Sequence, residues 1–416
     1  MKLKYIIFIL LGYVATAQQS LSLNECYELL DAHHPLLKQG AFYDEQNNLD
    51  LEILDNKRKP TIELLAQATH QSDVTSLPIS IPNINIEEPN KEQFKVSVGA
   101  NQLIYDGGLL KATEAAKKNS TSSKKKSLEV SVYQIRLKLN QLYYSVLSLQ
   151  EKDELLKLKL NLLQTKLKEI KAGIKYGVLL PSQDDIIEAE ILKIEQMIAG
   201  NKISKINLKN TISQLIFKDV TNDTFSKEDI SISLSDKIKR PELELFQLKK
   251  EEITNTSKIF DYKNKPKLFG FAQTGIGNPA LNMLDNSVQP YYIVGLKFKW
   301  NPYDWNTAKK EKQKLLINKA YIDNQQEIFE LNTKVELSNQ QSEIERVKTQ
   351  IASDIKIIEL RKKILKTVSS QLKNGVITSS IYITELTNLT EAEINLRTHK
   401  IQLILAKANY NTLLGA

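Results

Sequence analysis

The longest pattern in the sequence is helical. Between Leu109 and Tyr176, apolar residues recur at steps of three and four positions, and no proline interrupts them. This ladder has the period of a coiled coil and predicts a helix over about residues 109–173. At 1.5 Å per residue such a helix spans roughly 100 Å, which is longer than a compact domain needs. The ladder consists of Val132, Ile135, Leu139, Leu142, Val146, Leu149, Leu156, Leu160, Leu163, Leu167 and Ile170, with one break at Asp153.

A second apolar seam lies beside this ladder, at Leu155, Leu158 and Leu162. A helix with two seams buries both only when it has neighbours on two sides. The helical pattern alone fits two arrangements equally well: a helix with neighbours on both sides, as in the wall of a tube, and an ordinary two-stranded coiled coil. The rest of the chain decides between them.

Two shorter segments follow a period of two residues instead, and each is preceded by a segment that is a candidate for its partner strand. Phe94, Val96 and Val98 alternate with polar residues or glycine, and the same alternation returns between Tyr292 and Trp300. It predicts strands with one apolar and one polar face. The expected strands cover about residues 61–70, 94–104, 267–277 and 291–300, and the segments between the members of each pair are loop-like.

The chain contains this order of elements twice. Tyr105-Asp106 returns as Tyr303-Asp304, and the distance from each tyrosine to a marker glycine, Gly177 or Gly375, is 72 residues in both copies. Equal spacing over so long a stretch indicates an internal duplication. We therefore expect a first repeat over 18–216, a linker over 217–237 and a second repeat over 238–416. The helices that follow the strands are expected at about 109–173 and 182–215, and at about 307–372 and 379–414.

The first residues resemble an export signal. Lys2 and Lys4 precede a short apolar run, and Ala15-Thr16-Ala17 provides a cleavage site, so residues 1–17 are expected to be a signal peptide. The apolar run is too short to span a membrane as a helix, which needs roughly twenty residues. The single cysteine, Cys26, excludes an internal disulfide and is expected to be a buried helical residue.

The strand count changes how the long helices are interpreted. Four strands cannot close a barrel, and an open sheet edge cannot face lipid with unpaired backbone groups. Three chains would supply twelve strands and a closed wall. In that arrangement Val96, Val98, Val294 and Phe298 would face lipid, and Lys95, Ser97 and Lys297 would face the lumen. A small soluble sheet that caps a helical bundle is the alternative.

In order and spacing, several motifs resemble those of the TolC or outer-membrane factor family over essentially the whole mature chain. The residues that carry the resemblance are His34-Pro35, Leu103-Ile104-Tyr105-Asp106-Gly107-Gly108, Gly177-Val178-Leu179, Ala392-Glu393 and the closing run over 406–415. The resemblance implies a mixed α/β membrane protein. Its fold would be a trimeric 12-stranded β-barrel with four strands per chain, continued into a long α-helical coiled-coil barrel in the periplasm.

The resemblance also implies roles for three groups of residues. Strand-to-helix corners are expected at Tyr105, Asp106, Gly107 and Gly108, and at Tyr303 and Asp304. The second corner is expected to have a different shape, because Trp305-Asn306 follows it and two extra residues, including Pro302, come with it. Adaptor-docking tips are expected at Gly177, Val178, Leu179 and Leu180, and at Gly375, Val376, Ile377 and Thr378. A possible acidic gate consists of Asp184, Asp185, Glu188 and Glu385, for which ordinary solvated helix starts are the alternative.

The function that follows from the resemblance is an exit duct of a tripartite efflux system. The chain is expected to form a homotrimer. Its other expected partners are a periplasmic adaptor or membrane fusion protein, an inner-membrane pump of RND or ABC type, and outer-membrane lipid. A formal charge of +8 with interleaved lysines and glutamates gives no reason to expect a nucleic-acid partner. No catalytic, cofactor or metal motif is recognisable, so no enzyme is expected. A type I protein secretion duct and a periplasmic coiled-coil scaffold without a pore are the alternative functions.

Overall fold

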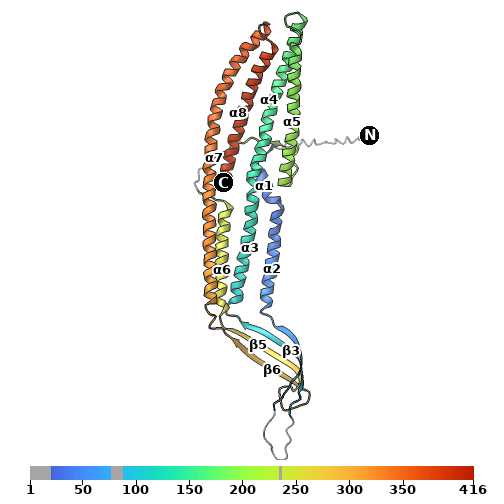
Figure 1. Ribbon diagram of the computed structural model, residues 1–416, viewed down its shortest axis with the longest axis vertical. Coiled ribbons are helices and arrows are strands. Elements are labelled where there is room, and N and C mark those ends of the chain that lie inside the picture. Colours follow the sequence, from blue (N-terminus) through green and yellow to red (C-terminus); the bar gives the residue numbers. More distant parts are fainter. Residues whose placement is uncertain (1–19, 76–87, 234–236) are drawn as a thin grey trace, which may run out of the picture. The chain divides into compact units, whose positions relative to one another are not determined.

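The computed structural model describes residues 20–75, 88–233 and 237–416 (Figure 1). The expected signal peptide at 1–17 and part of the loop between the first two strands lie outside these residues. The chain forms two compact units. Of the described residues, one unit contains 20–38, 128–233, 237–242 and 328–416 and is called the bundle unit below; the other, called the sheet unit, contains 39–75, 88–127 and 243–327. Each unit therefore takes segments from both halves of the sequence.

The sheet unit contains one four-stranded antiparallel sheet with the order β2-β3-β5-β6. The strands are β2 (Thr61–His70), β3 (Glu92–Tyr105), β5 (Lys267–Asn278) and β6 (Gln289–Lys299). Because β3 and β5 come from different halves of the chain and pair in the centre, the two β-hairpins form one continuous sheet.

Helices connect to both ends of each hairpin. They are α2 (Pro35–Asn56), α3 (Leu109–Tyr133), α6 (Pro241–Lys263) and α7 (Thr307–Lys373). Ion pairs join them two by two: the Lys125 ammonium lies 2.7 Å from Asp44 between α3 and α2, and the Lys250 ammonium lies 2.6 Å from Asp323 between α6 and α7.

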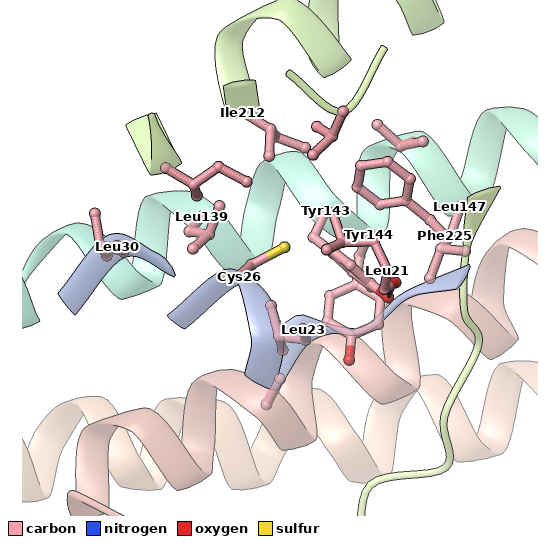
Figure 2. Close-up of a cluster of buried hydrophobic side chains, with 14 of the residues drawn as sticks. Leu21, Leu23, Cys26, Leu30, Leu139, Tyr143, Tyr144, Leu147, Ile212 and Phe225 are labelled. Atoms are coloured by element: carbon pink, nitrogen blue, oxygen red, sulfur yellow. Dashed lines mark hydrogen bonds between the residues drawn. The ribbon is translucent and has the colours of Figure 1, made fainter. Parts of the chain in front are cut away.

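The bundle unit is built from α1 (Leu23–His33), α4 (Ile135–Lys175), α5 (Gln183–Ile216), α8 (Ser379–Leu414) and the later part of α7. Its largest core lies between α1, α4, α5 and α8, where Cys26 is fully buried in the same cluster as Leu30 and Leu139 (Figure 2). Burial raises the pKa of the Cys26 thiol to about 12, so this thiol is neutral and packs as an apolar group. A short parallel pair, β1 (Ser20–Leu21) with β4 (Thr224–Phe225), ties the segment between the repeats to this core.

The break in the apolar ladder at Asp153 has a structural reason. Asp153 is buried on α4, where it accepts a hydrogen bond of 2.8 Å from the Asn201 side chain and forms an ion pair with Lys205, both on α5. A buried carboxylate is tolerated only with such partners. At Asp153, a polar contact between α4 and α5 therefore replaces one apolar contact of the ladder.

The helix expected over 109–173 is divided at Gln134 into α3 and α4. Gln134 keeps right-handed helical dihedral angles, and its N–H still donates to Val130 O at 3.1 Å. The interruption is thus a local irregularity rather than a turn. Among the described helices, none is long and apolar enough to cross a membrane.

Candidate membrane face and helix tips

One face of the sheet is apolar and exposed. The register places Leu64 opposite Val98 and Ala272 opposite Val294, so apolar residues of all four strands lie on the same side. Val294 keeps 72% of its surface exposed and Leu64 keeps 74%. The side chains of this apolar face are Ile62, Leu64, Ala66, Phe94, Val96, Val98, Leu268, Ala272, Ile276, Tyr292, Val294, Leu296 and Phe298.

The opposite face is mixed in polarity and more sheltered, and it includes Leu103, Phe269, Phe271 and Ile293 beside its polar residues. Ser97 is only 4% exposed and accepts a hydrogen bond of 2.8 Å from the Gln273 amide. At Gly275 a side chain would lie 2.3 Å from Val96 O, so the backbones of β3 and β5 approach closely there. A soluble sheet buries its more apolar face, whereas in this sheet the more apolar face is the more exposed one.

The sheet also ends in two open edges. Within the described chain, β2 pairs only with β3, and β6 pairs only with β5. Each edge therefore presents unpaired N–H and C=O groups over a long strand. A sheet with an apolar exposed face and two free edges is incomplete as it stands.

The first strand-to-helix corner is built around Asp106. Its carboxylate accepts hydrogen bonds from the N–H groups of Gly108 at 2.9 Å and Leu110 at 2.5 Å, which satisfies donors at the start of α3. Gly107 and Gly108 have φ angles of +72° and +94°, which favour glycine. A side chain at Gly107 would lie 2.4 Å from Lys265 Cβ, so this glycine also permits a close contact.

The second corner differs from the first before its cap and repeats it afterwards. β3 runs to Tyr105, directly before Asp106, whereas β6 ends at Lys299, five residues before Asp304. After Asp304, however, Trp305 and Asn306 have φ angles of 56° and 59° and repeat the left-handed conformation of Gly107 and Gly108. Asp304 likewise accepts from Ala308 N–H at 2.9 Å. That hydrogen bond, followed by one from Asn264, holds the pKa of Asp304 below its usual range. The cap therefore keeps its form although the glycines are absent. Tyr105 and Tyr303, which precede the two caps, are both exposed.

The two helices that precede a reversal in the bundle unit, α4 and α7, end in the same capping motif. After α4, the N–H groups of Gly177 and Val178 donate to Ile174 O at 3.0 Å and Gly173 O at 2.9 Å. After α7, the equivalent bonds join Gly375 to Leu372 O at 3.0 Å and Val376 to Gln371 O at 2.9 Å. These are Schellman caps, which require the positive φ of 73° and 69° found at the two glycines.

The aliphatic residues at these tips divide into two kinds. Val178, Leu180 and Val376 are exposed, by 59%, 71% and 69%. Leu179 and Ile377, in contrast, turn inward and pack against the core of the hairpins. Thr378 is exposed and begins α8 as its N-cap residue.

The two tips are joined to each other. The Gln183 side chain, at the start of α5, accepts a buried hydrogen bond of 2.6 Å from the Ser379 N–H at the start of α8. A side chain on Gly375 would lie 3.3 Å from Val178 O. Sequence reasoning missed Gln183, because a glutamine in a first helical turn has no feature that distinguishes it from a solvated one.

The four candidate gate acids have different surroundings. Glu188 forms an ion pair of 2.5 Å with Lys171, and Glu385 forms one of 2.9 Å with Arg361. The hydrogen bond from Lys171 to Glu188, with the nearby charges of Glu188, Asp184 and Asp185, raises the pKa of Lys171. Asp184 is half-buried and Asp185 is exposed. Two of the four carboxylates are therefore already compensated within one chain.

Similarity to solved structures extends over nearly the whole chain. The chain matches no protein-family model and no curated protein. It is similar in structure to the outer membrane protein VceC of Vibrio cholerae, with a TM-score of 0.64, 12% identity, and coverage of 95% of this chain and 96% of that one. For the Campylobacter jejuni CmeC outer membrane channel the TM-score is 0.64 at 14% identity, and the match covers 100% of this chain and 93% of that one. For the open-state MtrE channel of Neisseria gonorrhoeae the TM-score is 0.65 at 15% identity, with coverage of 95% of this chain and 89% of that one. The chain thus has the fold of TolC-like outer-membrane channels.

Proposed function

We propose that this chain is one subunit of a homotrimeric outer-membrane channel, the exit duct of a tripartite efflux system. The observation that carries the proposal is the sheet, whose more apolar face is the more exposed one and whose two edges are unpaired within the described chain. In lipid the apolar face is stable, but each free edge would cost several kcal/mol per unsatisfied backbone group.

Closure with two further copies resolves that cost. If β6 of one copy pairs with β2 of the next, three sheets supply twelve strands and no edge remains. The strands contain 10 to 14 residues, which suits tilted strands that cross a bilayer. The more polar face then lines the lumen. The helices would continue the barrel as a coiled-coil tunnel in the periplasm.

The partners follow from the helix tips. Val178, Leu180 and Val376 form an exposed aliphatic patch at two rigid caps, and such a patch suits contact with another protein. We assign it to a periplasmic adaptor that links the channel to an inner-membrane pump of RND or ABC type. The acids at 184, 185, 188 and 385 would then lie near the tunnel entrance, where three copies bring like charges together.

The similar structures support this assignment. VceC is described as an outer membrane protein, and CmeC and MtrE as outer membrane channels. By this likeness we infer an outer-membrane location and a transport role rather than catalysis. The energy for transport would then come from the pump.

Cell fractionation followed by planar-bilayer recording tests the proposal. We expect the protein in the outer-membrane fraction as an oligomer that dissociates only on heating, and we expect the purified oligomer to produce discrete conductance steps. A monomer in the soluble periplasmic fraction would support the coiled-coil scaffold and contradict the channel.

Gene deletion separates the two kinds of duct. Loss of an efflux channel should increase sensitivity to small toxic compounds and leave the set of secreted proteins unchanged. Loss of secreted proteins without a change in sensitivity would instead identify a type I secretion duct.

A further inference from the structure

The charged side chains of the four strands are divided unequally between the two faces. Among the described strand residues, the charged side chains of the apolar face are His70, when it is protonated, and Glu92, which lie at one end and interact at 3.0 Å. The opposite face carries four lysines, Lys95, Lys267, Lys297 and Lys299, against one acid, Glu63.

Three of these lysines gather at one end of β5 and β6. Lys267 is the first residue of β5 and is paired in register with Lys299, the last residue of β6. Lys297 lies two residues from Lys299 on the same face. Like charges directly opposite each other destabilise a sheet, so this lysine cluster is not explained by strand pairing.

The acids nearest in sequence are engaged elsewhere. Asp106 and Asp304 accept hydrogen bonds from the helix starts at Leu110 and Ala308. Asp261 forms an ion pair with Lys312. Among the described residues, none of the three clustered lysines belongs to an ion pair. The positive charge of the lysine cluster is therefore left for a mobile partner.

We propose that the lysine cluster makes the barrel lumen selective for anions and favours small anionic cargo. The inference rests on the proposed function, because it requires that the polar face line a closed pore. Threefold repetition places nine such lysines at one level of the lumen, and a wall of low dielectric concentrates their field on passing ions. Glu63 offsets only part of this charge.

Reversal potentials across a planar bilayer test the inference, with a tenfold gradient of potassium chloride as the probe. The native channel should prefer chloride to potassium. The triple variant Lys267→Gln/Lys297→Gln/Lys299→Gln should lower the chloride-to-potassium permeability ratio by about twofold or more. The single variant Lys95→Gln should act in the same direction but less strongly, because it removes one charge at the other end of the sheet.

A charge-matched control removes three lysines from helix α3 instead. Lys117, Lys118 and Lys125 are exposed and are paired with Asp50, Glu114 and Asp44. Lys117→Gln/Lys118→Gln/Lys125→Gln should leave the permeability ratio nearly unchanged. A channel that prefers potassium, or a ratio that responds equally to both triple variants, would overturn the inference and leave the channel itself standing. The absence of any trimer or conductance from the native protein would overturn the proposed function as well.

Discussion

Gly107 and Gly177 have nearly the same backbone conformation, with φ of +72° and +73°, but very different surroundings. A side chain at Gly107 would meet Lys265 Cβ at 2.4 Å, whereas nothing lies within 4 Å at Gly177. Left-handed conformation alone costs a residue other than glycine about 1–2 kcal/mol. We expect Gly177→Ala to cost about that much and Gly107→Ala to cost clearly more.

Thermal unfolding of the purified variants measures this difference. Gly200, inside α5, also has open space around it but no positive φ, so Gly200→Ala should stabilise by about 1 kcal/mol. Equal midpoints for Gly107→Ala and Gly177→Ala would show that the close contact with Lys265 contributes nothing.

Asn306 gives the complementary prediction. It adopts a φ of 59° at the position where the first corner has Gly108, and a glycine there would relieve the strain. We expect Asn306→Gly to raise the free energy of unfolding by up to about 1 kcal/mol. The stabilisation by Gly200→Ala gives the scale against which the gain from Asn306→Gly is compared. A thermal midpoint of Asn306→Gly below that of the native protein would contradict strain at Asn306.

The sequence predicted the local conformation at some single residues and gave no indication of it at others. The glycines at 177 and 375 indicated reversals because few residues accept positive φ. Trp305 gave no such signal, since its left-handed φ of 56° is imposed by the corner around it rather than by its own preference. Similarly, nothing in Val178-Leu179 indicates which of the two side chains turns inward.

Helices α4, α5 and α8 share a buried ion pair. The Lys159 ammonium donates to Glu190 at 2.7 Å and to the Thr387 hydroxyl at 3.0 Å, and the two charged side chains are 4% and 11% exposed. Removal of one partner leaves a buried charge, so Glu190→Ala should cost about 3–5 kcal/mol.

The double variant Lys159→Met/Glu190→Leu is the matched control for this pair. It removes both charges and keeps most of the volume, and it should be near neutral or stabilising by chemical denaturation. If the double variant lost as much stability as Glu190→Ala, packing rather than charge would explain the loss.

Most elements with a long period were predictable from the sequence. The strands alternate over ten residues, and the helices repeat over many turns, so each pattern exceeds chance. The two-residue strands β1 and β4 were not predictable, because a pairing this short has no period. The irregularity at Gln134 was also missed, since its neighbours continue the apolar ladder.

In the proposed barrel, the face of the sheet on which a strand residue lies determines whether its side chain contacts lipid or the lumen. Val294 and Ile293 are neighbours on β6 and lie on opposite faces of the sheet. If the apolar face contacts lipid, Val294→Lys near the bilayer centre should cost about 2–4 kcal/mol. We expect Val294→Lys to reduce the heat-resistant oligomer in the outer membrane strongly and Ile293→Lys to reduce it less. Equal amounts of both variants would contradict the assignment of faces.

The duplication predicted the elements but not their grouping. Each half of the sequence contributes to both compact units, because β3 pairs with β5 and α4 packs with α8. Such pairings between halves have no sequence signal of their own. Closure by further copies has no sequence signal either, and it follows from the exposed apolar face and the free edges of the sheet.

The number of chains in the native assembly tests the central claim most directly. Native mass spectrometry of the protein extracted from isolated outer membranes should give a single species of three copies. A monomer or a dimer from that fraction, or recovery of the protein only as a soluble species, would contradict the account.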